Sequence, residues 1–170
     1  MGQSTSDRIL DAAEARLRLT GYNGFSFRDL AEDIGIKSAS VHHHFPTKEA
    51  LAIRLAESYT ERFMTALETA PTGPARIGAY RELFRDSLKD GGKMCLCGML
   101  GAEISGLPAS VTAKAKDFFE AITTDLEANL KDHADPRGKA LAVLARLEGA
   151  LILGRTYADL AVFDQAVADL

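Results

Sequence analysis

Residues 26–51 read SFRDLAEDIGIKSASVHHHFPTKEAL and decide the fold of the first part of the chain. Ser26, followed three residues later by Asp29, has the pattern of a capping box at the start of a helix. Gly35 is placed to end that helix, and Pro46 limits the helix that follows to about two turns. Two short helices joined by a glycine turn predict a helix-turn-helix motif.

The second short helix carries hydrogen-bond donors and no acidic residue, and Ser38 is predicted to cap it. No Asp or Glu occurs between Asp33 and Glu49. A helix that enters the major groove between two phosphate backbones needs such a surface. Residues 1–50 hold six Lys and Arg against seven Asp and Glu, a net charge of −1, so DNA binding must depend on where the donors lie. The donors of this stretch are Lys37, Ser38, Ser40, His42, His43, His44, Thr47 and Lys48.

The rest of the chain has the apolar spacing of helices. Its 170 residues, 46% of them hydrophobic, suffice for one full domain or for a small module joined to a helical body. Apolar side chains recur three and four residues apart and no alternating strand pattern occurs, so the chain is predicted to be all-α with eight or nine helices. Beyond the motif, helices are expected near 9–20, 48–67, 77–90, 95–104, 109–131 and 139–161, with Gly21 ending the first in a left-handed conformation and Asp135, Pro136 and Gly138 forming a turn.

Gly35, the helix end at His44 and Phe45, and Lys48 at the start of the next helix together resemble the tetracycline-repressor (TetR/AcrR) family of transcriptional regulators. The resemblance covers roughly the first third of the chain by motif and the remainder only by architecture. It implies an N-terminal three-helix helix-turn-helix DNA-binding head and a C-terminal helical ligand-binding and dimerisation bundle. We place these at residues 1–50 and 51–170.

The resemblance also implies which residues bind double-stranded DNA. Ser26 stands where the family usually has a Thr that caps the helix against phosphate, and Arg28 follows it on the DNA side. His42 replaces a Tyr that commonly contacts phosphate, whereas Lys48 keeps the usual phosphate contact. We expect contacts to phosphates or base edges from Ser26, Arg28, Lys37, Ser38, Ser40, His42, His43, Thr47 and Lys48.

The helical body is expected to form a homodimer and to bind a small, largely apolar effector that releases the repressor from a palindromic operator. The helices near 109–131 and 139–161 would pair across a two-fold axis, where Gly149 and Gly154 let backbones approach. The alternative is that these glycines relieve crowding inside one subunit. Candidate effector contacts, for most of which a place in the core is the favoured alternative, are Tyr59, Phe63, Tyr80, Phe84, Met99, Glu103 and Phe118.

Cys95 and Cys97 form the chemically unusual part of the body. A thiol near a helix N-terminus can react as a thiolate, so a redox or electrophile sensor is one alternative. Soft sulfur ligands for Cu(I) are a second alternative, and two small buried residues are the third. Consecutive histidines diverge around a helix, so residues 42–44 are not expected to bind one metal ion, and no cofactor is expected.

Other classes of protein find little support. The chain lacks a glycine-rich phosphate loop, GxSxG and HExxH, so it is not expected to be an enzyme, with a thiol enzyme or a helical adaptor as the remaining alternatives. Its net charge of −4 argues against a protein that coats nucleic acid. No apolar run is long enough for a membrane span, and the polar residues 1–7 hold no signal sequence, so a cytoplasmic location without a membrane partner is expected.

Overall fold

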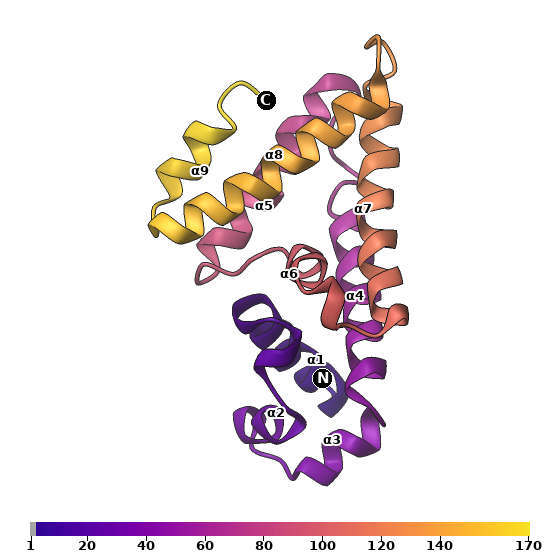
Figure 1. Ribbon diagram of the computed structural model, residues 1–170, viewed down its shortest axis with the longest axis vertical. Coiled ribbons are helices and arrows are strands. Elements are labelled where there is room, and N and C mark those ends of the chain that lie inside the picture. Colours follow the sequence, from indigo (N-terminus) through magenta and orange to yellow (C-terminus); the bar gives the residue numbers. More distant parts are fainter. Residues whose placement is uncertain (1–2) are drawn as a thin grey trace. The chain divides into compact units, whose positions relative to one another are not determined.

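The computed structural model describes residues 3–170, and across these residues the chain is built from helices without any strand (Figure 1). Residues 1 and 2 of the polar N-terminal segment lie outside the described part. The prediction of an all-α chain with eight or nine helices is confirmed. The helices are α1 (Thr5–Thr20), α2 (Phe27–Ile34), α3 (Ser38–His44), α4 (Lys48–Thr65), α5 (Arg76–Lys89), α6 (Leu96–Ala102), α7 (Ala109–Asn129), α8 (Pro136–Tyr157) and α9 (Leu160–Ala166), with short 3-10 turns at Tyr22–Gly24, Gly73–Ala75 and Ile104–Gly106.

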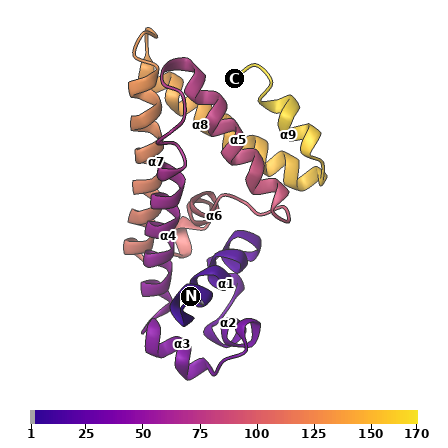
Figure 2. The ribbon, with the colours of Figure 1, turned by 180° about the vertical axis from the view of Figure 1, so that it is seen from behind.

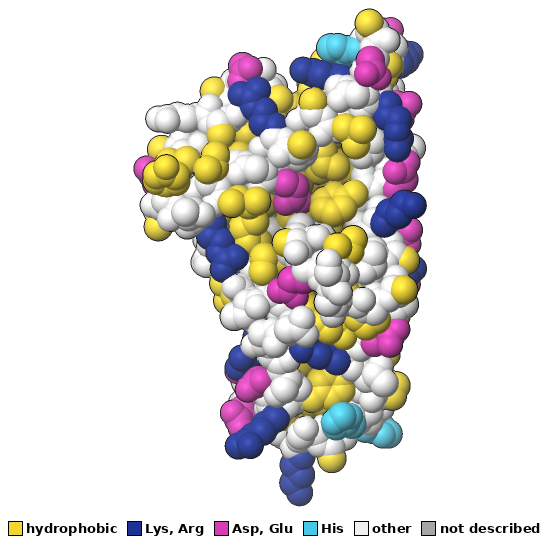
Figure 3. Space-filling model, in the orientation of Figure 1, with side chains coloured by type: hydrophobic (Ala, Val, Ile, Leu, Met, Phe, Trp, Pro, Cys, Tyr) yellow, Lys and Arg dark blue, Asp and Glu magenta, His cyan; other side chains and the backbone are white. Residues whose placement is uncertain are grey.

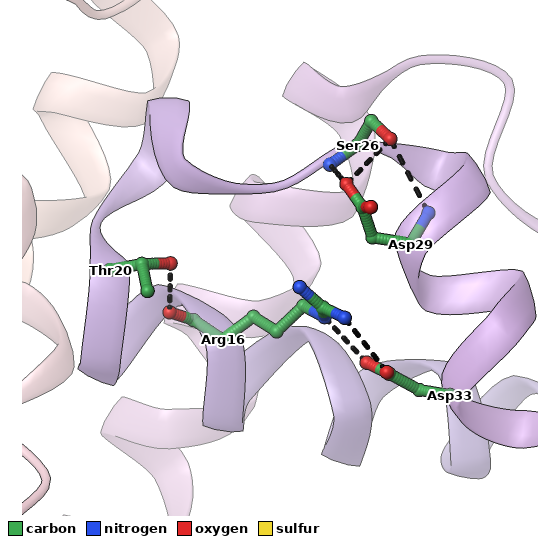
Figure 4. Close-up of polar contacts among 5 residues, drawn as sticks. All are labelled: Arg16, Thr20, Ser26, Asp29 and Asp33. Atoms are coloured by element: carbon green, nitrogen blue, oxygen red, sulfur yellow. Dashed lines mark hydrogen bonds and ion pairs between the residues drawn. The ribbon is translucent and has the colours of Figure 1, made fainter.

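The helix-turn-helix motif forms at the predicted residues, and capping hydrogen bonds and a left-handed glycine set the ends of its helices. The Ser26 hydroxyl accepts the Asp29 backbone N–H at 3.3 Å, and the Asp29 carboxylate accepts the Ser26 N–H at 2.7 Å, which completes the predicted capping box (Figure 4). Gly35 ends α2 in the left-handed conformation, with φ at +69°. The hydroxyl of Thr47 accepts the N–H of Ala50 at 3.0 Å, which satisfies an otherwise free donor in the first turn of α4.

Three predicted helix ends differ from the structure. Ser38 does not cap α3, because the capping position is Lys37 and no side chain bonds the first turn. Gly21 has φ +82° and ψ 176°, so it ends α1 with a positive φ but outside the left-handed helical region. Asp135 and Pro136 open α8 instead of forming a turn: the Asp135 carboxylate accepts the Gly138 N–H at 2.9 Å, and proline suits the first helical position because it needs no donor there.

The last predicted helix is also shorter at its C-terminal end than its apolar pattern suggested. Ala158 adopts a left-handed conformation, with φ at +51°, and separates α8 from α9. A Cβ on Gly154 would lie 2.7 Å from Leu88 Cδ1 and 3.2 Å from Phe163 Cβ. Gly154 therefore permits close packing inside one chain, the alternative considered for it, and the prediction that it lies between subunits is wrong.

The described residues pack into two compact units, and the first combines residues up to 59 with residues 96–116. Arg16 on α1 holds Asp33 on α2 through two bonds of 2.5 and 2.8 Å (Figure 4). Lys114 on α7 pairs with Glu57 on α4 at 3.0 Å. The core of this unit consists of buried apolar residues that include Ile9, Leu17, Leu30, Val41, Phe45, Leu51 and Leu55.

The second unit combines residues 60–95 with residues 117–170. In it α5 packs against α8 and α9, an arrangement that Figure 2 shows from behind. The Asp125 carboxylate accepts two bonds from the Arg76 guanidinium, at 2.6 and 2.8 Å, and a third from the Tyr80 hydroxyl at 2.7 Å. This ion pair is largely shielded from water and fully hydrogen-bonded, which a charged pair in such a place requires.

We expect Gly21→Ala to destabilise the chain by about 2 kcal/mol or more. The positive φ is unfavourable for a residue with a side chain, and the new Cβ would lie 1.7 Å from the Glu103 carboxylate. Urea unfolding followed by circular dichroism measures the change. Gly78→Ala on α5 is the control, because its Cβ meets open space; it should stabilise by up to about 1 kcal/mol. Equal effects of the two substitutions would contradict this account of Gly21.

Candidate nucleic-acid interface

A hollow of about 460 Å³ opens beside the start of α2 and gathers residues from α2, α3 and α4. Five of the nine residues predicted to bind DNA line it, and aromatic side chains form the rest of its wall. The lining residues are Phe25, Ser26, Phe27, Arg28, Ser38, His42 and Lys48. The hollow therefore brings together most of the side chains that the sequence assigned to phosphate contact.

Lys48 is held at this hollow by two aromatic rings. Its ammonium nitrogen lies 4.8 Å from the centre of the Tyr22 ring and 4.3 Å from that of Phe25, and it donates a hydrogen bond to the Phe25 carbonyl. Burial lowers the pKa of Lys48, and the negative charge of Glu103 opposes this shift. The cation is thus fixed in place and partly stripped of water, as a preorganised anion contact would be.

The other charged and titratable groups at the hollow are accessible. The His42 ring is exposed and meets Phe27 edge-on at a centroid distance of 4.8 Å. Arg28 pairs with Glu32 at 3.0 Å, but the side chains are 83% and 63% exposed, so this pair is weak enough for a phosphate to compete with it. In Figure 3 the α3 histidines reach the surface of this part of the molecule.

Ser26 and Asp29 limit what the hollow can bind. The Ser26 hydroxyl donates to the Asp29 carboxylate at 2.7 Å, so a phosphate at Ser26 would compete with that acid. Hydrogen bonds from Ser26 lower the pKa of Asp29, which keeps the carboxylate ionised. A phosphate is therefore best placed toward His42 and Lys48, away from Asp29.

The remaining predicted DNA contacts lie outside the hollow on α3 and at the turn that follows it. Lys37, His43 and Thr47 are exposed, and Ser40 is half-buried. Although the Thr47 hydroxyl accepts the α4 cap bond, it can still donate its proton. These residues share the exposed side of α3 and of the α3–α4 turn, a surface suited to a groove.

The predicted site residues did not include the Phe25 and Phe27 rings that line the hollow or the Tyr22 ring beside Lys48, although three aromatic residues within six positions were a readable signal. The partner of Glu103, which follows α6, was not predicted either. The Glu103 carboxylate accepts the backbone N–H of Tyr22 at 2.9 Å. These residues are 81 positions apart in the sequence, so no local pattern could have revealed the bond.

The seven predicted effector contacts divide between the two units. Tyr59, Met99 and Glu103 belong to the first unit, where Arg18 lies 5.8 Å above the Tyr59 ring. In the second unit the ring of Phe63 packs against the rings of Tyr80, Phe84 and Phe118 at centroid distances of 6.1, 5.7 and 5.3 Å. These four rings are at most 9% exposed and form one aromatic cluster.

Cys95 and Cys97 are 1% and 0% exposed, which favours their interpretation as small buried residues over a reactive thiol sensor. The thiol of Cys95 hydrogen-bonds to the carboxyl group of Glu148 on α8. Within residues 3–170 no three His, Cys, Asp or Glu side chains are grouped closely enough to hold a metal ion. None of the described helices is sufficiently long and apolar to cross a membrane.

A three-helix head that contains a helix-turn-helix motif, and that gathers basic and hydroxyl side chains at one hollow, is typical of helix-turn-helix transcriptional regulators. Comparison with known proteins agrees, since residues 9–55 match the model of the bacterial regulatory proteins of the tetR family. The chain is 32% identical to a TetR transcriptional regulator from Legionella pneumophila, with a TM-score of 0.91 over 97% of this chain and 94% of that one. The chain therefore belongs to the TetR family of transcriptional regulators.

Two further relatives support this assignment. A TetR-family regulator from Agrobacterium tumefaciens has 28% identity and a TM-score of 0.90, over 96% of this chain and 93% of that one. The negative transcriptional regulator IcaR of the icaADBC biofilm operon of Staphylococcus epidermidis is 26% identical over 136 residues, which cover 79% of this chain and 72% of IcaR. The expectation that the chain is a regulator and not an enzyme is confirmed by these matches.

We expect the stability of the chain to fall as pH rises from about 4.5 to 7 because of Glu148. Burial raises the pKa of Glu148 to about 7 from 4.5, while the Cys95 thiol acts in the opposite direction. Between these values the folded chain keeps a proton that the unfolded chain releases, so ionisation favours unfolding. Glu148→Gln should be more stable than the parent chain at pH 8, by up to about 3 kcal/mol, and similar to it near pH 4.5.

Urea unfolding at a series of pH values measures this difference. Glu82→Gln is the control, because the Glu82 side chain is 59% exposed; its stability curve should run parallel to that of the parent chain. A Glu148→Gln curve that also stays parallel would show that Glu148 has an ordinary pKa.

Proposed function

We propose that the chain binds a palindromic operator as a homodimer and represses transcription until a small, largely apolar effector releases it. Residues 1–50 would bind DNA, and residues 51–170 would bind the effector and dimerise. The observation that carries the proposal is the hollow at α2, where Lys48, His42 and Arg28 meet. We infer repression from the similarity to IcaR, whose name describes a negative regulator.

In this proposal the hollow receives a DNA phosphate and α3 reads the major groove. Lys48 would contact the phosphate as a fixed cation, and His42 would donate to it in place of the phenol usual in the family. Lys37, Ser40 and His43 on or beside α3 would face base edges and adjacent phosphates. In a dimer the two copies of α3 would be about 34 to 36 Å apart, which is one turn of B-DNA.

The proposed dimer surface is the outer face of α8. Leu141, Ile152 and Leu153 are 49%, 55% and 45% exposed, and hydrophobic side chains gather over α8 in Figure 3. A Cβ on Gly149 would meet nothing within 4 Å, so a second helix has room to approach there. Large exposed apolar side chains concentrated on one helix are the usual mark of a protein interface.

The aromatic cluster of the second unit is the proposed site of effector contact, and an effector would have to separate Phe63, Tyr80, Phe84 and Phe118 to enter it. The sequence also predicts effector contacts from Tyr59, Met99 and Glu103, which belong to the first unit and are not part of this cluster. Oxidant sensing by Cys95 and Cys97 is not favoured, because neither thiol is accessible.

Selection of DNA from a genomic fragment pool by the purified full chain tests the proposal. Enrichment of a two-fold symmetric site at moderate salt is the expected result. Enrichment of asymmetric single half-sites would overturn the homodimer, and absence of any enrichment would overturn operator binding.

Lys48→Ala should weaken binding to every DNA sequence alike and lower the slope of log affinity against log salt by about one unit. The reason is that one cation contacting phosphate releases about one counterion. Fluorescence anisotropy over a salt series measures the slope, and circular dichroism checks that the head remains folded. Lys131→Ala, an exposed lysine of the other unit, should leave the slope unchanged. The same slope for Lys48→Ala would mean that Lys48 does not touch phosphate.

Ile152→Arg should dissociate the dimer, because it places a charge in the middle of the proposed apolar interface. Sedimentation velocity should show at least a tenfold weaker self-association. Ile104→Arg is a matched control, since Ile104 is 52% exposed but lies in the first unit, in the 3-10 turn after α6. Loss of the dimer in both variants, or in neither, would contradict the α8 interface.

A further inference from the structure

Glu148 is a half-buried acid that the functions proposed above do not use. It is the only acidic residue of α8 and lies near the middle of that helix. Its side chain is half-buried, and its Oε1 atom is enclosed with no hydrogen-bond partner in the described chain. The Cys95 thiol hydrogen-bonds to the same carboxyl group. One oxygen of the acid is therefore enclosed without a donor.

Asp125, in the same unit, is a carboxylate that accepts hydrogen bonds on both oxygens. Asp125 accepts two bonds from Arg76 and one from Tyr80, all between 2.6 and 2.8 Å. An enclosed acceptor without a donor costs free energy, and the cost is larger when the group is charged. An enclosed Oε1 without a hydrogen bond is thus unfavourable for Glu148 in the chain alone, and a donor from another molecule would remove the cost.

Among residues 3–170, no cation donates to this oxygen. Arg146, two residues before Glu148 on α8, donates instead to the Ala166 carbonyl and to the Asp169 carboxylate. Lys93, two residues before Cys95, pairs with Asp90 at 2.8 Å. The basic groups nearest in sequence to the acid and to its thiol partner are already engaged.

The surroundings of Glu148 are apolar. Leu144 and Leu151, about one turn away on either side, are buried, as are Leu147 beside it and Met94 next to Cys95. A donor that reaches Oε1 in such a place must be attached to an apolar body. A cationic donor makes the strongest bond to a carboxylate, because the hydrogen bond is charge-assisted.

We propose that Oε1 of Glu148 accepts a hydrogen bond from the effector, and that the effector is an apolar molecule carrying a protonated amine. This inference rests on the proposed function, because it names the chemical class of the effector. The amine supplies the donor missing at Oε1, and its apolar body packs against the leucines of α8. A neutral molecule of the same shape leaves the oxygen without a donor.

The experiment measures binding of two probe series to the purified full chain by isothermal titration calorimetry. One series consists of phenylalkylamines with two to five methylene groups, and the other of their methyl ethers, which cannot donate a hydrogen bond. At least one amine is expected to bind about tenfold more tightly than its ether. Glu148→Gln should remove this preference, while the control Glu82→Gln, on the exposed side of α5, should retain it.

Equal binding of amines and ethers, no binding of either series, or an amine preference that survives in Glu148→Gln would each overturn the proposal. Sedimentation velocity on Glu148→Gln without probe identifies one competing source of the donor. A tenfold change in dimer dissociation without any amine preference would mean that a second copy of the chain supplies the donor to Oε1, and would overturn the proposal as well.

The same protein samples are tested for operator binding without any probe, so the two proposals can fail separately. Operator binding without an amine preference refutes only the nature of the effector. An amine preference without operator binding refutes the proposed function and leaves a ligand site at Glu148.

Discussion

The position of the Lys48 ammonium is the constraint on which the DNA-binding head depends. It joins the first turn of α4 to the segment before α2 through the Phe25 carbonyl and the rings of Tyr22 and Phe25. Tyr22 is in turn held by Glu103 through its backbone N–H. Without this arrangement the two helices of the motif would keep their caps but lose the shared hollow between them.

In the proposed complex with DNA, this arrangement would serve both the stability of the head and the binding of a phosphate. A lysine amine that is partly buried among rings gains cation–π attraction, and it loses less hydration when a phosphate arrives than a fully solvated amine would. The exposed His42 and the weakly paired Arg28 can then adjust to the phosphate. A head whose overall charge is not basic can bind DNA in this way, because its few cations lie where phosphates would lie.

The second unit contains two half-buried acids that differ in their hydrogen bonds. Asp125 is fully bonded by Arg76 and Tyr80 and fixes α5 against α7. Glu148 keeps an enclosed oxygen without a donor, and burial raises its pKa to about 7. Of the two acids, Asp125 has the contacts of a structural residue, and the enclosed oxygen of Glu148 is the one that we propose binds the effector.

The sequence by itself determined the features that depend on neighbours a few residues apart. The Ser26–Asp29 capping box, the left-handed Gly35 and the Thr47 cap all follow from local hydrogen bonding and backbone geometry, and together they specify the helix-turn-helix motif. Local patterns did not decide whether Lys37 or Ser38 occupies the capping position of α3. They also did not distinguish a helix start from a turn at Asp135.

Only the tertiary structure decided the contacts between residues far apart in the chain. The Glu103–Tyr22 bond, the packing of Gly154 against Leu88 and Phe163, and the enclosed oxygen of Glu148 depend on which helices meet. An apolar stripe shows that a helix face is covered but not what covers it, because many partners can satisfy the same pattern. The burial of an acid and the donors that reach it both depend on how the whole chain packs.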